Sequence, residues 1–409
     1  MSVEAAREVI RRCRMIAACS DEPGFTTRTF LSDSMRKVHG MIGVWMTAAG
    51  MEVRVDPAGN LRGVYAGAST DARRVLIGSH LDTVPHAGAF DGVLGVVMGV
   101  SLIESLHRRR LPYSIEVIGF SDEEGVRFGV PFIGSRAVVG ELDAALLAAQ
   151  DANDVSVAQA IRNFKLDPSR MADARADANP LGYLEFHIEQ GPLLESVDCP
   201  LAIVDRINGR TAAEVTFVGA AGHAGTTPMT TRRDAVAGAA EWIGCVEAQA
   251  RGTRGLVATT GRIDAEPGAT NVIAGRCRVT IDVRHPDDSV RMAAIERLRL
   301  AAQDIGARRR LQVDWTSRVD QSSAVMDPQL VAMLARALEA AGAPMTVMSS
   351  GAGHDAMVLA PYMPVAMLFI RTPGGISHHP DESVDEEDVT IALATGMNFL
   401  NELAASIGV

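Results

Sequence analysis

The apolar stretches of this sequence are short and alternate with helical segments, and that alternation leaves few folds open. VLIGSH (75–80), SIEVIGF (114–120) and YLEFHIE (183–189) have the composition of strands, and GVLGVVMGVSLIESLHR (92–108) has that of a buried helix. Strands that alternate with helices are typical of an α/β sheet covered on both faces. We therefore expect an α/β fold.

Polar side chains follow several of these predicted strands. His80 ends the first strand, Glu123 and Glu124 follow the second, and His187 with Glu189 closes the third. Chemistry in such sheets collects at the carboxyl ends of the strands. We expect these side chains to lie near one another.

Residues 210–322 have a different pattern, in the order strand, helix, strand, strand, helix, strand. A β-α-β-β-α-β unit can fold as a small domain of its own. We therefore predict an α/β domain with a mixed sheet, formed by residues 1–209 and 323–409. An α+β domain of residues 210–322 is expected to interrupt it.

Charge and cysteine content exclude several classes of protein. The 409 residues carry 39 Lys and Arg against 50 Asp and Glu, a net charge of 39 − 50 = −11. This argues against nucleic acid or an anionic membrane as a partner. No apolar run reaches about 18 residues, so no membrane-spanning helix is expected. The five cysteines are widely spaced and the N-terminus has no apolar signal segment, so we expect a cytoplasmic protein without a disulfide framework.

The segment GSHLDTVPHAGAFDGVLG holds the first group of candidate ligands. A neutral imidazole such as that of His80 is a good zinc ligand, and the carboxylate of Asp91 could bridge two ions. Asp82 could hold the other ring nitrogen of a histidine ligand. A structural hydrogen bond between His80 and Asp82 is the alternative.

Adjacent carboxylates in FSDEEGVRFG could divide two roles between them. One could bind a metal ion while the other accepts a proton from the attacking water. A solvated run of charge is the alternative interpretation of Glu123 and Glu124.

Further histidines lie in polar or glycine-rich segments. They are His187 in EFHIEQGP, His223 in GHAGTTP, His354 in SGAGHDA, and His378 and His379 in GGISHHPDES. Each one alone could be structural. Taken together, they allow a site for two metal ions with Asp91 as the bridge and Glu123 as the proton acceptor. The other ligands would be His80, Glu124, His187 and one of His378 or His379. The absence of cysteine from these segments suits zinc, manganese or cobalt and argues against an iron–sulfur cluster.

These segments, with NVI (271–273) and DVR (282–284), occur in an order that resembles the hydantoinase/carbamoylase branch of the dinuclear-metal peptidase superfamily. The resemblance extends from about residue 20 to 400. It implies a metal-binding α/β domain and an inserted domain that acts as a lid and forms the homodimer contact. It also implies two divalent ions, with zinc favoured and manganese, cobalt or nickel as alternatives.

The resemblance also assigns roles to individual residues. His80 and His187 would bind one ion, Glu124 and His378 the other, with Asp91 shared and Glu123 as the general base. His223 would stabilise the reacting carbonyl oxygen, and it could come from the partner subunit. Substrate contacts would be made by Asn271, Arg284 and Gln190. From chemistry alone, Arg284 could instead form a surface salt bridge, although its guanidinium suits a carboxylate.

The activity that the resemblance implies is hydrolysis of a carbamoyl or ureido C–N bond in a carboxylate-bearing small molecule. The resemblance leaves two candidate substrates, an N-carbamoyl-L-amino acid and allantoate. Many relatives carry an arginine about eleven residues before the histidine of GHAGTTP, whereas this chain has Ala212 there. An aminopeptidase or dipeptidase is the nearest alternative. A non-catalytic binding protein is disfavoured because every ligand position is intact.

Overall fold

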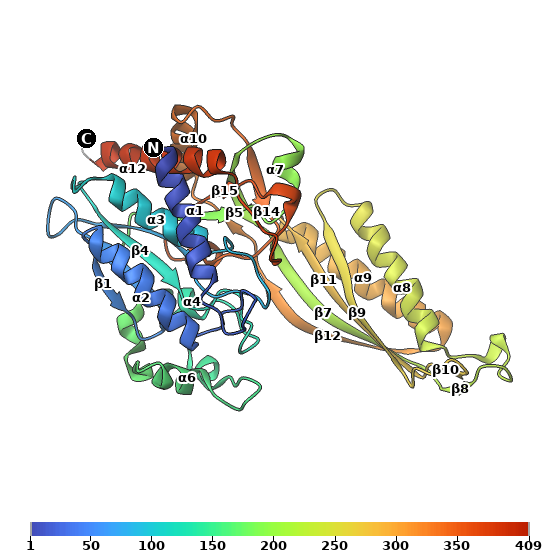
Figure 1. Cartoon of the computed structure of the whole chain (residues 1–409). Coiled ribbons are helices and arrows are strands. Elements are labelled where there is room, and N and C mark those ends of the chain that lie inside the picture. The colour runs from blue at the N-terminus through green and yellow to red at the C-terminus, as the bar shows by residue number, and fades with distance from the viewer. Residues whose placement is uncertain (1, 408–409) are drawn as a thin grey trace. The chain divides into compact units, whose positions relative to one another are not determined.

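The computed structural model describes residues 2–407 (Figure 1). The chain divides into two compact units. Unit 1 comprises the chain up to Asp205 and from Val325 onward, and unit 2 comprises Arg206–Ala324. The sequence pattern puts the insertion at 210–322.

Unit 1 is built on a mixed sheet, which in the described residues has nine strands. In sequence they are β1 (Glu52–Val55), β2 (Leu61–Tyr65), β3 (Arg74–His80), β4 (Ser114–Phe120), β5 (Gly182–Ile188), β6 (Leu201–Ile207), β13 (Ala324–Val325), β14 (Val347–Ser350) and β15 (Val365–Ile370). Their order across the sheet is β1-β2-β4-β3-β5-β15-β6-β13, and β14 pairs with β6. The central strands β4, β3, β5 and β15 run parallel, while β2 runs antiparallel to β4 and β6 runs antiparallel to β15. The predicted α/β fold with a mixed sheet is confirmed.

The helices of unit 1 contribute to two apolar cores. The larger apolar core joins β2–β5 and β15 to α1 (Val3–Ala17), α2 (Asp33–Ala48), α3 (Val93–Ser105), α10 (Pro328–Ala340) and α12 (Glu386–Ile407). A smaller core gathers Phe30 and Phe128 with α4 (Ile133–Val139), α5 (Ala144–Ala148) and α6 (Val157–Asn163). Helix α3 is apolar on all sides because it is buried nearly throughout.

The turn into α3 needs a glycine. Gly92 has φ +65°, and a Cβ added there would lie 2.4 Å from Nε2 of His80. A side chain at this position would be strained and would also collide with the His80 ring. The glycine therefore lets the start of α3 approach the end of β3.

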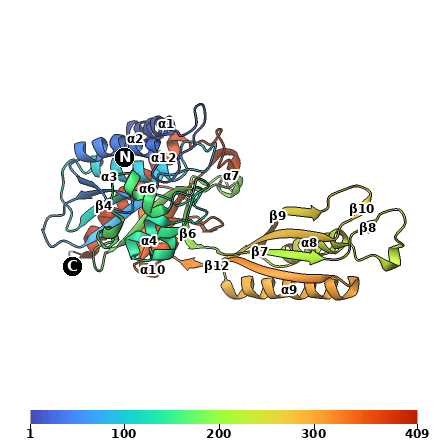
Figure 2. The same cartoon turned by 90° about the horizontal axis from the view of Figure 1, so that it is seen from below.

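Unit 2 is a four-stranded antiparallel sheet with two helices (Figure 2). The strand order is β12 (Gln312–Gln321), β7 (Gly209–Val218), β11 (Arg276–His285) and β9 (Val257–Glu266). The helices α8 (Ala235–Arg251) and α9 (Asp288–Arg309) lie beside each other and share one apolar core with the sheet (Figure 1). The short strands β8 (Gly222–His223) and β10 (Val272–Ile273) form a separate pair. The order of the six long elements is the predicted β-α-β-β-α-β order.

Among residues 2–407, no helix combines the length and the apolar character that crossing a bilayer requires.

Candidate metal centre

Neighbouring parallel strands carry the predicted ligands of unit 1 to one edge of the sheet. His80 is the last residue of β3, and His187 is the next to last of β5. Glu124 follows β4 by four residues, and His378 lies in the loop after β15. Asp91 lies between β3 and α3. Because carboxyl ends of parallel strands meet at one edge, side chains distant in sequence come together there.

The five side chains form two groups that share Asp91. Nε2 of His187 lies 3.4 Å from Nε2 of His80 and 3.2 Å from Oδ1 of Asp91. On the other side, Nε2 of His378 lies 3.1 Å from Oδ2 of Asp91 and 3.3 Å from Oε1 of Glu124. Potential ligand atoms lie within 4.8 Å of one another in the set of His80, Asp91 and His187, and likewise in that of Asp91, Glu124 and His378.

The hydrogen bonds of the two buried imidazoles fit metal binding. Nδ1 of His80 lies 3.0 Å from the backbone oxygen of Asp82, and Nδ1 of His187 lies 2.9 Å from that of Ile188. A carbonyl oxygen only accepts, so each Nδ1 carries a proton, and Nε2 is the nitrogen that each ring turns into the cluster. Both Nε2 atoms lie beside the carboxylate of Asp91. The donor set therefore suits one divalent ion in each group, bound through imidazole and carboxylate.

The electrostatics of the cluster favour positive charge. Hydrogen bonds to Asp91 and Glu124 raise the pKa of His378 to about 10. Burial opposes ionisation of Asp91, but the hydrogen bond from His378 and the charge of His187 hold its pKa well below the usual range. Burial raises the pKa of Glu123 well above its usual value, with Glu124 adding to the shift and His80 opposing it. The carboxylates of the cluster thus have few positively charged partners among the side chains around them.

Asp82 holds the segment with the paired glutamates. Its Oδ1 accepts the backbone N–H of Glu123 and its Oδ2 that of Glu124, each at 3.0 Å. The contact with Nδ1 of His80 comes mainly from the backbone oxygen of Asp82, since its carboxylate lies 3.6 Å from that atom. Asp82 therefore connects the ends of β3 and β4.

Gln190 lies among the predicted ligands. Its Nε2 donates to both carboxylate oxygens of Asp91, at 3.0 and 3.2 Å, and lies 3.4 Å from Nε2 of His378. Both Gln190 and His378 have φ near +60°, a conformation uncommon outside glycine and frequent at functional sites.

Two further histidines were candidates from the sequence. His379 is exposed, and its Nδ1 accepts the N–H of Asp381, so the structure brings His378 and not His379 to the cluster. His354 is buried, with its ring centroid 4.4 Å from that of His187, and its Nε2 bonds Ser350 rather than Asp355. His354 thus packs behind a predicted ligand.

The sequence did not identify Glu382 as a residue of the site, although it lies in the segment GGISHHPDES. It is 5% exposed, and its carboxylate contacts the backbone of Phe90 and Asp91. A glutamate in a polar loop is usually exposed to solvent. Its position four residues after His378 was the only feature of the sequence that pointed to a role in the site.

The predicted substrate contacts of unit 2 fall into two places. His223 pairs with Val272 in the β8–β10 ladder, and the oxygen of Asn271 accepts the N–H of Ala224. Arg284 lies near the other end of β11, where its guanidinium binds the carboxylate of Asp282 at 2.7 Å.

The separation of these two places follows from the strand register. Gly219 bonds Gly275 just before Arg276, so the β8–β10 pair extends from that end of β11. Arg276 and Arg284 are eight residues apart on one strand, which corresponds to about 26 Å. His223 and Arg284 therefore occupy opposite ends of unit 2, and β8 and β10 lie at the end that holds His223 (Figure 2).

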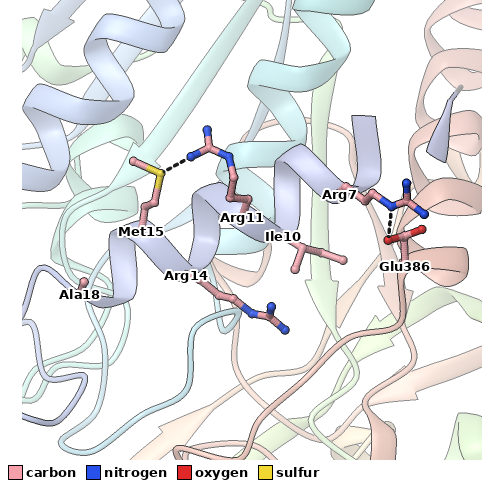
Figure 3. A pocket seen from close by; sticks show the side chains of 7 residues that line it. All are labelled: Arg7, Ile10, Arg11, Arg14, Met15, Ala18 and Glu386. Carbon is pink, nitrogen blue, oxygen red and sulfur yellow. Dashed lines mark hydrogen bonds and ion pairs between the residues drawn. The ribbon is translucent and has the colours of Figure 1, made fainter. Parts of the chain in front are cut away.

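A hollow of about 520 Å³ lies along α1, and its lining includes none of the predicted site residues (Figure 3). Arg7 is paired with Glu386 at 2.8 Å, and Arg11 with Glu8 at 2.7 Å. These exposed arginines balance nearby carboxylates.

Comparison with known proteins agrees with this geometry. Residues 76–402 match the model of peptidase family M20/M25/M40. Allantoate deiminase 1 of Glycine max is 37% identical over 97% of this chain and 89% of its own length. The N-carbamoyl-L-amino acid amidohydrolase of Geobacillus stearothermophilus is 38% identical over 90% of this chain and 91% of its own.

Solved structures of one branch of that family share the fold along the whole chain. A hydantoinase/carbamoylase family amidase from Burkholderia ambifaria has a TM-score of 0.89 at 33% identity, covering 98% of this chain and 97% of its own. With the shared-carboxylate cluster, these likenesses show that the chain belongs to peptidase family M20/M25/M40 and is an amidohydrolase of its hydantoinase/carbamoylase branch.

Proposed function

We propose that the protein hydrolyses a carbamoyl or ureido C–N bond of a small carboxylate-bearing molecule, either an N-carbamoyl-L-amino acid or allantoate. Two divalent ions, with zinc favoured over manganese, cobalt and nickel, would assist the reaction. The observation that carries the proposal is the shared position of Asp91. One of its oxygens faces His80 and His187, and the other faces His378.

His80 and His187 would hold one ion and Glu124 and His378 the other, with Asp91 contacting both. The bound ions would act as Lewis acids on the substrate carbonyl and make the attacking water more acidic. Glu123 is 8% exposed, and its backbone N–H is bound by Asp82. We assign Glu123 the role of accepting the proton from water and delivering it to the leaving nitrogen.

Arg284 is assigned to the substrate carboxylate, and the amide of Gln190 to the ureido group. The ion pair with Asp282 fixes the direction of the Arg284 guanidinium. Arg210 binds the same carboxylate from the opposing strand, with its Nε 2.6 Å from Oδ2 of Asp282. Ala212, at the position where many relatives carry an arginine, is two residues along from Arg210 and on the same face of β7. A second cation is thus present beside Arg284.

His223 is assigned to the reacting carbonyl oxygen and Asn271 to the substrate. One small substrate cannot bridge the two ends of a single unit 2, which are about 26 Å apart. We therefore propose a homodimer in which one subunit supplies His223 and Asn271 and the other supplies Arg284. β9 suits the dimer contact, because it is an edge strand with Val257 and Ile263 more than half exposed.

A substrate panel tests the proposed activity. Metal-stripped protein reloaded with zinc, manganese or cobalt is given allantoate, several N-carbamoyl-L-amino acids, N-carbamoyl-β-alanine and dipeptides, and product formation is measured. Ammonia release from allantoate or from an N-carbamoyl-L-amino acid should far exceed dipeptide cleavage. Faster dipeptide cleavage, with no ureido turnover, would show that the protein is a peptidase.

A further inference from the structure

Glu382 connects the two loops that carry Asp91 and His378. Its Oε1 accepts two successive backbone N–H groups, from Phe90 at 2.8 Å and from Asp91 at 3.0 Å. Its Oε2 accepts the hydroxyl of Ser377 at 3.3 Å, one residue before His378. A single buried carboxylate thus contacts both loops.

Gly88 makes this contact possible. A Cβ added at Gly88 would lie 2.3 Å from Cβ of Glu382 and 2.5 Å from its Oε1. Since such distances do not occur between real side chains, any other residue at position 88 would displace the carboxylate. The loop around Asp91 is therefore shaped to receive Glu382.

Asp82 makes a matching arrangement at the other side of the cluster. Each of these two carboxylates binds two successive backbone N–H groups, and each pair includes a predicted ligand. Asp82 lies two residues after the ligand at the end of β3, and Glu382 four residues after His378. Fixed backbone of this kind orients ligands before an ion arrives.

We propose that Glu382 is a positioning residue that holds the shared Asp91 and His378 facing each other for metal binding. The proposal rests on the metal centre of the proposed function. It depends on the length of the side chain and on a hydrogen bond at each of its two terminal atoms, because these span the gap between the loops. Without Glu382 the N–H groups of Phe90 and Asp91 lose their acceptor, and the turn around Asp91 can relax.

Variants of Glu382 distinguish the effect of its side-chain length from the effect of its charge. Glu382→Ala removes the bridge, and loss of such supporting contacts typically weakens metal binding about 10- to 100-fold. Glu382→Gln keeps the length and an acceptor oxygen but removes the charge, so binding should stay within about threefold of wild type. Glu382→Asp keeps the charge but is one methylene shorter, so binding should weaken. Gly88→Ala should also weaken metal binding, because the added methyl group would displace the carboxylate of Glu382.

Asp327→Ala is the matched control. Asp327 also accepts two successive backbone N–H groups, from Gln329 and Leu330, at the start of α10. This variant should lower the melting temperature of unit 1 without changing metal affinity. It therefore measures what the loss of an equivalent backbone acceptor does elsewhere in the fold.

Zn²⁺ binding to metal-stripped full-length protein, measured by competition with a coloured chelator, tests the proposal, and thermal unfolding checks that each variant folds. Weak binding in Glu382→Ala, Glu382→Asp and Gly88→Ala, with near-normal binding in Glu382→Gln, supports it. Normal binding in Glu382→Asp with weak binding in Glu382→Gln would overturn it in favour of a charge effect. Unchanged affinity in all Glu382 variants would overturn it and leave the metal centre intact. Absence of Zn²⁺ binding by wild type would overturn the proposed function as well.

Discussion

The Nε2 atoms of His80 and His187 lie 3.4 Å apart, and both point towards the carboxylate of Asp91. Both imidazoles are buried, and each Nδ1 is bound to a backbone oxygen. Two ring nitrogens held this way beside a carboxylate are placed to bind one cation. The core of unit 1 should therefore become more stable when ions bind.

Metal ions are expected to raise the melting temperature of the stripped protein. Binding at a free concentration of 100 Kd stabilises the folded state by about 2.7 kcal/mol for each site. His187→Ala should abolish the share of this gain that comes from its own site, about half of the total for two sites. His285→Ala changes a buried histidine of unit 2 and should retain it. Calorimetry with and without Zn²⁺ measures both, and an equal gain in His187→Ala would exclude His187 as a ligand.

Arg284→Ala should raise KM for carboxylate-bearing substrates. A hydrogen bond between charged groups is worth about 1.5–3 kcal/mol, so KM should increase about 10- to 100-fold. An analogue in which an amide replaces the carboxylate should show little change. Arg278→Ala alters an arginine on the same face of β11, paired with Glu266, and is the control. An equal loss on both substrates would mean that Arg284 is structural.

Mixing two impaired variants, assayed at a substrate concentration well below KM, tests the shared site. His223→Ala and Arg284→Ala each lack one contribution to every site in their own homodimers. In a mixed dimer, one of the two sites combines an intact His223 with an intact Arg284. Random exchange of equal amounts should then restore about one quarter of wild-type activity, since half of the dimers are mixed and half of their sites are complete. Activity that stays at the level of the separate variants would argue that each subunit works alone.

His39 should make the protein less stable in mild acid. Burial, with the charges of Arg36 and Arg28, lowers the pKa of His39 to about 4, and in the described part of the chain neither ring nitrogen has a hydrogen-bond partner. The folded-state pKa is thus below the unfolded value near 6.5, so below pH 6.5 only the unfolded state gains the proton. Stability should fall by about 2 kcal/mol between pH 8 and pH 5 from this residue.

Denaturant unfolding of His39→Leu at several pH values isolates that contribution. The variant should lose this part of the pH dependence, whereas a change at the exposed His107 should keep it. A His39→Leu protein with the wild-type pH slope would show that the proton penalty arises elsewhere.

The main sheet and the metal cluster could both be predicted from the sequence, because predicted strands also indicate where their polar ends meet. Apolar runs as clear as VLIGSH and SIEVIGF identify buried strands, and parallel strands bring their ends together. The strands β1 and β2 were missed because EVRV and LRGVY are only four and five residues long and each contains at least one charged residue. Arg62 in β2 is nevertheless fully buried, since Glu116 binds its Nε at 2.6 Å. The partner of this charge lies on the neighbouring strand, so the sequence of β2 alone does not reveal the ion pair.

Other features of the site depend on contacts that a single sequence does not reveal. Glu382 resembles a solvated loop residue until the turn at Gly88 is seen to enclose it. The roles that the sequence assigned to His223, Asn271 and Arg284 did not show that these residues lie at two separate places in unit 2. That separation follows from the antiparallel register of β7 and β11, which pairs Val218 with Arg276 and Arg210 with Arg284.

Metal titration of Glu123→Gln beside wild type tests the central claim most directly. Stripped wild-type protein should bind two ions per chain, and ammonia release from its best ureido substrate should rise with occupancy. Glu123→Gln should bind the same two ions yet turn over about 10²- to 10⁴-fold more slowly, because the proton acceptor is lost. Near-normal turnover by Glu123→Gln, or full wild-type activity after the ions are removed, would contradict a two-ion amidohydrolase with Glu123 as its base.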